Sequence, residues 1–205
     1  MKNRSEIAHV SRETLERLAA FEELVRKWTQ KINLISPRTV PDIWERHIVD
    51  SAQFWSAVEA PPKTWTDLGS GGGFPGIVVA LLSEEFEPLT KMTLVEADKR
   101  KAAFLRHAAI QLDLRSTTIA SSRIEALDGA RSDVVSARAL APLPKLLPLV
   151  ARHLSPDGVA LLAKGVAVAP ELDEVAGNWR FDMVEIPSRT TENGRILRLT
   201  NIERR

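Results

Sequence analysis

A glycine-dense turn, Asp67-Leu-Gly-Ser-Gly-Gly-Gly-Phe-Pro-Gly76, contains the residues best suited to hold a ligand. Glycine lets bare backbone approach a bound molecule and lets the chain adopt conformations closed to other residues. Gly71, Gly73 and Gly76 satisfy the G-x-G-x-x-G pattern, which taken alone is a weak signal of nucleotide binding. The turn lies between a strand-like run and an apolar, helix-like run, so we expect a ligand at the carboxyl end of that strand.

Two carboxylates accompany this turn. Asp67 lies two residues before the first glycine, Gly69, and Glu96 ends a second strand-like run over residues 91–95. A carboxylate at the second position can accept hydrogen bonds from both hydroxyls of a ribose. Asp67 would repel the pyrophosphate of a dinucleotide but attract the ammonium or sulfonium of S-adenosylmethionine, so the sequence favours the latter. The alternatives are that Asp67 only caps the following helix and that Glu96 is an ordinary exposed acid.

The composition limits the classes of protein. With 205 residues the chain has room for one sizeable core and a small appendage. It has no cysteine, which excludes a disulfide framework, a thiolate zinc site and a cysteine nucleophile, and no tyrosine, which one large class of nicotinamide enzymes needs. No apolar run reaches membrane-spanning length and no secretory core follows the first residues, so we expect no membrane partner, a cytoplasmic location and no metal site. A net charge of +1 confines nucleic-acid binding to local basic patches.

The chain divides near Pro61-Pro62, and we expect residues 1–60 to form a helical segment packed on a catalytic domain of residues 61–205. Apolar residues at helical spacing, with charged residues between them, indicate the first helix. They are Ile7, Val10, Leu15, Leu18, Phe21, Leu24, Val25 and Trp28. A second helical stretch is expected over residues 41–58.

After Pro62, strand-like and helix-like runs alternate, which predicts a mostly parallel sheet covered on both faces. A helix over residues 98–112 should turn one apolar face inward. That face comprises Ala102, Ala103, Leu105, Ala108, Ala109 and Leu112. Strands are expected near residues 64–68, 91–95, 116–120, 133–137 and 159–163, then a hairpin near 181–185 and 195–200. This order predicts the α/β, Rossmann-like fold of class I S-adenosylmethionine-dependent methyltransferases, with seven strands and a helical extension at the amino terminus.

Further motifs are spread in a fixed order from residue 28 to residue 165. They are Trp28, Lys31, Asn33-Leu34, Arg46-His47, Asp50-Ser51, the loop from Asp67 to Gly76, Glu96, Lys99-Arg100-Lys101, Phe104-Leu105, Ser122-Arg-Ile-Glu125, Ser136-Ala-Arg-Ala139 and Lys164-Gly165. In these residues the chain resembles the bacterial small-subunit ribosomal RNA methyltransferase G family, also called the glucose-inhibited division protein B family. A match spread this widely is far more specific than any one motif.

The resemblance implies transfer of a methyl group from S-adenosylmethionine to N7 of a guanine in 16S ribosomal RNA, near the decoding site. It implies that the cofactor contacts several residues at the strand ends. Gly69 and Phe74 would line the site, Glu96, Ala97 and Asp98 would surround the ribose, Ile124 and Glu125 would flank the adenine, and Arg138 would reach the cofactor or the target base. From the loop itself we add Asp67, Gly71 and Gly73 to the cofactor-binding residues.

The chemistry of such a transfer makes Arg138 the candidate catalytic residue. N7 of guanine has a free lone pair and no proton, so no general base is needed, and the main requirement is alignment of the reacting atoms. Arginine usually reads guanine through two hydrogen bonds to O6 and N7, and that mode would occupy the nucleophile itself. Arg138 should therefore contact the base from elsewhere. The alternative is a surface ion pair.

For the RNA we expect basic residues near the cofactor to contact phosphates, namely Lys99, Arg100, Lys101 and Lys164. The alternative for each is a solvated surface side chain. His47 can pair with Asp50 or Ser51, so a structural network and a substrate contact both stay open. We expect a monomer whose partner is 16S ribosomal RNA or the small ribosomal subunit. Two alternatives stay open as well, a methyltransferase acting on another RNA site or a small molecule, and a non-catalytic, cofactor-dependent assembly factor.

Overall fold

A seven-stranded sheet runs through the centre of the computed structural model, which describes residues 7, 9–166 and 168–205. The strands are β1 (Thr64–Leu68), β2 (Lys91–Val95), β3 (Thr117–Ala120), β4 (Ser132–Arg138), β5 (Leu154–Lys164), β6 (Trp179–Pro187) and β7 (Arg195–Arg204). Their order is β3-β2-β1-β4-β5-β7-β6, and β7 runs antiparallel to both of its neighbours. The predicted α/β class, the mostly parallel sheet and the final hairpin are confirmed.

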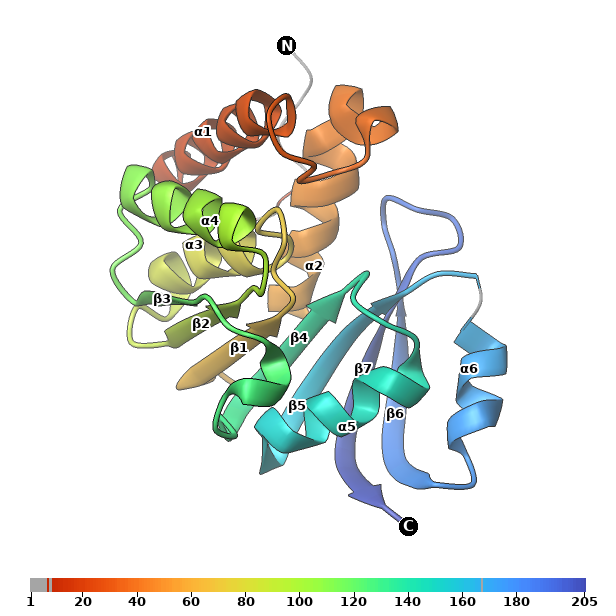
Figure 1. Cartoon of the computed structure of the whole chain (residues 1–205). Coiled ribbons are helices and arrows are strands. Elements are labelled where there is room, and N and C mark those ends of the chain that lie inside the picture. Colours follow the sequence, from red (N-terminus) through yellow and green to blue (C-terminus); the bar gives the residue numbers. More distant parts are fainter. Residues whose placement is uncertain (1–6, 8, 167) are drawn as a thin grey trace.

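Within the described residues, six α-helices cover the two faces of the sheet. They are α1 (Arg12–Thr29), α2 (Asp50–Ser56), α3 (Gly76–Phe86), α4 (Lys99–Gln111), α5 (Leu143–His153) and α6 (Val168–Val175). Figure 1 shows α1 to α4 gathered on one side of the sheet and α5 and α6 on the other, and each side has its own apolar cluster. Neighbouring strand residues such as Val134 and Val135 belong to opposite clusters because successive side chains of a strand point to opposite faces. No helix among the described residues is both long and apolar enough to cross a bilayer.

The amino-terminal helix is shorter than its apolar pattern predicts. Ile7 and Val10 precede α1, which begins at Arg12, because the Ser11 side chain accepts a hydrogen bond from the backbone N–H of Thr14 and caps the helix there. The rest of the pattern faces inward, and Phe21 is fully buried. Residues 1–6 and 8, which the predicted segment includes, lie outside the described residues.

The second helical stretch is real but irregular. It comprises a 3₁₀ turn at Pro37–Asp42, a π-helical turn at Trp44–Val49 and α2. A π-helical turn is wider than an α-turn and is frequent at functional sites. This turn carries His47, which faces the strand ends, and it leads directly into Asp50 at the start of α2.

Two details of the region from β2 to β4 differ from expectation. Ala103 of α4 is exposed, and Phe104 is fully buried in its place because it packs against the rings of Phe21 and Trp28. Between β3 and β4 the chain forms only a short 3₁₀ turn at Ile124–Ala126.

Candidate active site

A cavity of about 890 Å³ opens at the carboxyl ends of β1, β2 and β4, where the strand order reverses. This is the position at which open α/β sheets bind ligands. Eight of the predicted cofactor residues line it. They are Gly69, Gly71, Phe74, Glu96, Ala97, Ile124, Glu125 and Arg138. The cavity therefore brings together residues from β1, β2, β4 and the turn after β3.

Glu96 fixes the shape of the glycine loop. Its Oε2 accepts a hydrogen bond from the backbone N–H of Gly71 at 2.8 Å, and its Oε1 accepts one from the N–H of Asp98 at 2.7 Å. Gly71 has φ +53°, a left-handed conformation that other residues adopt at a cost. A carboxylate has about four lone-pair positions, so Glu96 can hold the loop and still accept hydrogen bonds from a ligand.

Asp67 lies beneath the loop rather than in the cavity, which corrects the direct ammonium contact expected from the sequence. Its side chain is fully buried, Ser136 Oγ donates a hydrogen bond of 2.6 Å to Oδ1, and Oδ2 would be only 2.7 Å from a Cβ placed on Gly76. Burial raises the pKa of Asp67 to about 6, while the hydrogen bond from Ser136 opposes this rise. Asp67 therefore supports the loop from below and makes Gly76 necessary.

Two more predicted cofactor residues lie outside the cavity lining. A Cβ on Gly73 would be 2.9 Å from the ring of Phe21, so this glycine serves the close packing of α1 on the loop. Asp98 is the N-cap of α4 and accepts hydrogen bonds from the backbone N–H groups of Arg100 and Lys101, which lower its pKa. Both residues shape the site without lining the cavity.

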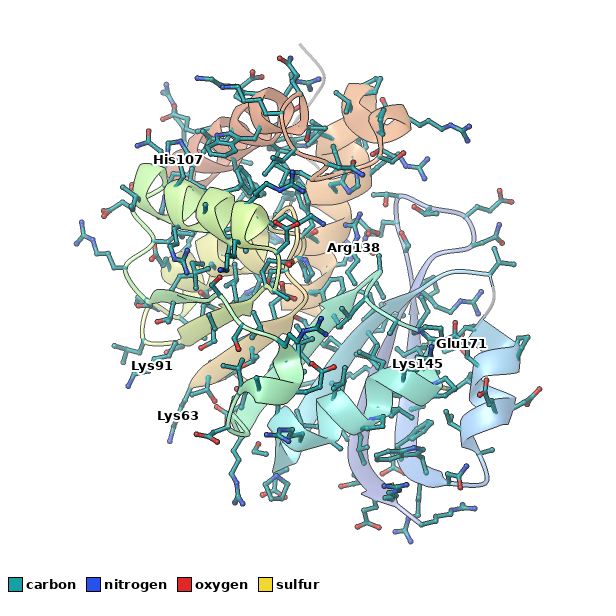
Figure 2. All side chains as sticks on the ribbon, viewed as in Figure 1. Lys63, Lys91, His107, Arg138, Lys145 and Glu171 are labelled. Atoms are coloured by element: carbon teal, nitrogen blue, oxygen red, sulfur yellow. The ribbon has the colours of Figure 1, made fainter. Side chains whose placement is uncertain are left out.

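Arg138 lies on the cavity wall, where β4 meets the amino-terminal segment (Figure 2). Its side chain is 17% exposed and pairs with Asp50 at 3.4 Å. It also donates to Nδ1 of His47, and the Phe74 ring lies 5.8 Å from the centre of the guanidinium. Burial lowers the pKa of Arg138, and the charges of Asp50 and Asp67 oppose that effect. The alternative of a surface ion pair is wrong, because this ion pair is largely buried.

His47 is held on both sides of its ring. One nitrogen faces Arg138, and Nε2 lies 2.8 Å from Thr39 Oγ1. Burial and the positive charges of Arg138 and Arg46 lower the pKa of His47 to about 3, so the ring is neutral at physiological pH. The structural network that the sequence left open is therefore present, and it joins the amino-terminal segment to β4.

The predicted RNA-binding cations separate into different environments. Lys101 lines the cavity, whereas Lys99 and Arg100 lie outside its lining. Lys164 is a correction, because its side chain is only 8% exposed and its Nζ donates to the Ala141 carbonyl (2.9 Å) and to Glu171 Oε2 (2.8 Å). The positive charge of Lys164 is therefore paired with Glu171 next to the site.

Several cavity residues were missed from the sequence. Ile35 and Ser36 reach the cavity from the loop after α1, next to Leu34, which was noted only as part of a family motif, and Lys145 reaches the cavity from the first turn of α5. The sequence gives no sign that the loop after α1 folds back to the strand ends. Lys145 has no distinguishing pattern around it, because a lysine in an amphipathic helix usually marks a solvated face.

Comparison with known proteins places the chain in a family. The family model described as rRNA small subunit methyltransferase G matches residues 14–196. The chain belongs to this family. The family predicted from the motifs between residues 28 and 165 is thus confirmed, and with it the methyltransferase class and the S-adenosylmethionine cofactor.

Two relatives from the methyltransferase G family match this chain over nearly its whole length. It is 48% identical over 196 residues to the ribosomal RNA small subunit methyltransferase G of Ruegeria sp. (strain TM1040), covering 95% of this chain and 94% of the relative. The protein of the same name from Cereibacter sphaeroides (strain ATCC 17029 / ATH 2.4.9) is 47% identical over 93% of this chain and 92% of its own length. In structure the chain is similar to a SAM dependent methyltransferase from Aquifex aeolicus, with a TM-score of 0.60 at 13% identity over 87% of this chain and 97% of that one. This last likeness concerns the fold alone.

Proposed function

We propose that this protein transfers a methyl group from S-adenosylmethionine to N7 of a guanine in 16S ribosomal RNA. The observation that carries the proposal is the cavity itself, which places the glycine loop, Glu96 and the largely buried Arg138 around one space at the carboxyl edge of the sheet. Family membership supplies the class of reaction and of substrate. The guanine N7 position is our inference from that family and from the chemistry of the site.

The residues present fit the cofactor. Gly69 and Gly71, both with positive φ, expose backbone at the end of β1, and the Glu96 carboxylate stands at the end of β2, where it can accept hydrogen bonds from the ribose hydroxyls. Ile124 gives the cavity an apolar wall for an adenine, with Glu125 beside it. When bound, the cofactor supplies an electrophilic methyl group on a sulfonium that departs as a neutral thioether.

The chain's own contribution to the reaction is orientation. Methylation of N7 needs no proton acceptor, and neither His47 nor Asp67 is free to act as one. His47 is neutral but has both ring nitrogens engaged, and Asp67 is buried below the loop. Alignment of reacting groups can supply much of the rate enhancement of a transfer reaction. Arg138 is placed to orient the guanine or the cofactor from the wall of the cavity.

Cofactor binding by a loop variant tests whether the glycine loop binds S-adenosylmethionine, apart from any effect on the fold. Gly71→Val should raise the Kd for S-adenosylmethionine by at least about tenfold, because a β-branched residue resists the left-handed φ of +53°. A Cβ at this position would meet no atom closer than 3.7 Å, so the change should disturb the conformation of the loop and not the core. Calorimetric titration gives the affinity and circular dichroism checks the fold. Wild-type affinity in the variant would contradict the cofactor assignment.

We propose that RNA phosphates meet three cations at the cavity, Lys101, Arg123 and Lys145. They come from α4, the turn after β3 and α5, so they surround the opening from different elements. Phosphate contacts give salt-sensitive affinity with little sequence information. These cations replace Lys164, whose charge is already paired with Glu171.

Two variants, each with several substitutions, test the RNA assignment. The assay measures transfer of a labelled methyl group to small ribosomal subunits from cells that lack this protein. The alanine triple variant of Lys101, Arg123 and Lys145 should raise KM for the subunit by at least about tenfold and flatten its salt dependence. The matched control is Lys63→Ala with Lys91→Ala, at the amino ends of β1 and β2, which Figure 2 shows at the opposite edge of the sheet from Arg138. Equal effects of the two variants would contradict a specific RNA surface at the cavity.

We also propose that the protein acts as a monomer in the cytoplasm. The apolar face of α1 is covered by its own chain, since Leu18, Phe21 and Val25 are fully buried. That helix therefore offers no free apolar stripe for a second copy. Light scattering of the purified protein at micromolar concentration should give a mass close to 22.7 kDa. A mass of twice that value would contradict the proposal.

A further inference from the structure

Both terminal nitrogens of Arg138 face partners from the amino-terminal segment. Nη1 lies 3.4 Å from Ser51 Oγ and 3.4 Å from Asp50 Oδ2. Nη2 donates to the carbonyl of Arg46 at 3.3 Å and to Nδ1 of His47. Both terminal nitrogens therefore have partners, and Nε carries the remaining one of the five N–H groups of a guanidinium. Within the described part of the chain, no hydrogen bond from Nε accompanies these four contacts.

This arrangement restricts how Arg138 can contact a guanine. An arginine forms its usual bidentate contact with guanine through two N–H groups that reach O6 and N7 together. Both bidentate modes of a guanidinium need at least one terminal nitrogen, and both terminal nitrogens of Arg138 are engaged. Only a single hydrogen bond from Nε remains for a ligand. A single bond can orient a base without covering N7.

The hydrogen-bond roles of His47 follow from its two partners. Arg138 can only donate, so Nδ1 of His47 must accept and carries no proton. Nε2 then carries the proton and donates to Thr39 Oγ1, and that hydroxyl donates to the Ser36 carbonyl at 2.9 Å. The charged groups beside the ring are Arg138 from β4 and Arg46 from its own turn, both of which disfavour a second proton. His47 is therefore an acceptor for Arg138 with a fixed tautomer.

Asp50 is fixed from its other side. Its Oδ1 accepts hydrogen bonds from Ser188 Oγ at 2.8 Å and from Thr190 Oγ1 at 3.1 Å, in the turn between β6 and β7. Its Oδ2 therefore faces Arg138 in one orientation. The side chain of Asp50 is only 18% exposed, which strengthens the ion pair relative to one at the surface. The turn between β6 and β7 thus holds Asp50, and Asp50 in turn holds the guanidinium of Arg138.

We propose that His47 and Asp50 are positioning residues that prevent Arg138 from binding guanine through two hydrogen bonds and so keep N7 uncovered for methylation. The inference rests on the proposed function, because it concerns how the same cavity presents its target base. It assigns to His47 and Asp50 a role in productive orientation of the base, in addition to joining the amino-terminal segment to the sheet.

Two substitutions of His47 separate its acceptor from its ring. His47→Phe keeps a ring beside Phe74 but removes the acceptor, whereas His47→Asn keeps an oxygen near the position of Nδ1 and removes the ring. Both lose the contact with Thr39. On small ribosomal subunits we expect His47→Phe to lower kcat by at least about tenfold with KM unchanged or lower, and His47→Asn to remain within about threefold of wild type. His107→Phe is the control, since His107 packs on Trp28 in α1, away from Arg138 (Figure 2).

Nucleotide binding tests the mechanism without turnover. With S-adenosylhomocysteine present, the wild type should bind guanosine 5′-monophosphate and its 7-deaza analogue, which lacks N7, with similar affinity. His47→Phe frees a terminal N–H for a bidentate contact, so it should bind the monophosphate about tenfold tighter than the analogue. Equal binding of both nucleotides by His47→Phe would overturn the proposal, as would an equal loss of kcat in His47→Phe and His47→Asn.

The tautomer of His47 is measured directly by nitrogen NMR of the protein alone, with the signal assigned by its disappearance in His47→Asn. We expect an unprotonated Nδ1 and a protonated Nε2, unchanged between about pH 5 and pH 8. A protonated Nδ1 would overturn the network. If wild-type protein failed to methylate small subunits while the tautomer and the nucleotide preference were as expected, the proposed function would fail and the geometry of the network would stand.

Discussion

At the scale of single residues, the two carboxylates of the site have opposite environments. Glu96 lies at the cavity and uses its charge to hold backbone N–H groups of the loop. Asp67 lies under the loop and is fully buried. The sequence identified both acids from their distance to the glycines. It could not give the direction of the Asp67 side chain, because its partner Ser136 lies 69 residues away on β4.

The burial of Asp67 predicts a pH-dependent stability. Its pKa is raised from 3.8 to about 6, so its contribution to stability is fully present below about pH 4 and is lost as the pH rises through about 6. The difference between these two pKa values corresponds to about 3 kcal/mol in the free energy of unfolding. Relative to Asp67→Asn, the wild type should lose stability over this range, as measured by urea unfolding at several pH values. Parallel pH profiles for the two proteins would contradict the raised pKa.

At the scale of elements, regular patterns were predictable and irregular turns were not. The alternation of β1 and β2 and the apolar face of α1 follow from short-range periodicity, so the sequence placed them well. The π-helical turn at Trp44–Val49 has no such signature, although it carries His47 toward β4. The cavity residues from distant elements, such as Ile35 and Lys145, were missed for the same reason, because only the tertiary fold brings them to the site.

A largely buried ion pair joins the end of β5 to α6, and its removal should destabilise the protein without weakening RNA binding. Lys164 donates to Glu171, which also accepts from the backbone N–H of Leu143. Burial would raise the pKa of Glu171, but the hydrogen bonds from Lys164 and Leu143 together lower it, so this stabilisation is lost as the pH falls through that pKa.

Lys164→Met should therefore cost about 1–3 kcal/mol in the free energy of unfolding, since Glu171 would lose its main partner. Replacing both residues, Lys164→Met with Glu171→Leu, should recover part of this loss. Thermal denaturation gives the stability, and the slope of KM with salt reports the RNA contacts. Unchanged stability together with a flatter salt dependence would restore Lys164 to the RNA-binding residues.

At the scale of the whole molecule, we propose that the amino-terminal segment and the sheet unfold together although the sequence divides near Pro61-Pro62. The ring of Phe21 in α1 packs against the ring of Phe74 in the loop, with 5.1 Å between ring centroids, and against the ring of Phe104 in α4, with 6.5 Å between centroids. The same apolar cluster contains residues from both sides of the division. The segment thus helps to build the cavity and does not form a separate module.

Phe21→Ala tests this shared core. The substitution should lower the free energy of unfolding by about 3–5 kcal/mol, because it leaves a cavity between α1, the loop and α4. Wild type and variant should each unfold in one urea transition that is the same by tryptophan fluorescence and by circular dichroism. Two separate transitions, with the helical segment melting first, would instead support independent domains of residues 1–60 and 61–205.

The identity of the methylated atom tests the central claim most directly. Small ribosomal subunits from cells lacking this protein are incubated with it and methyl-labelled S-adenosylmethionine, and the 16S ribosomal RNA is then digested and its modified nucleosides are mapped. We expect the label in 7-methylguanosine at a single site, and at least about tenfold less label with Arg138→Ala, which retains the glycine loop and Glu96. Label in another nucleoside, or none despite cofactor binding confirmed by calorimetry, would contradict the account.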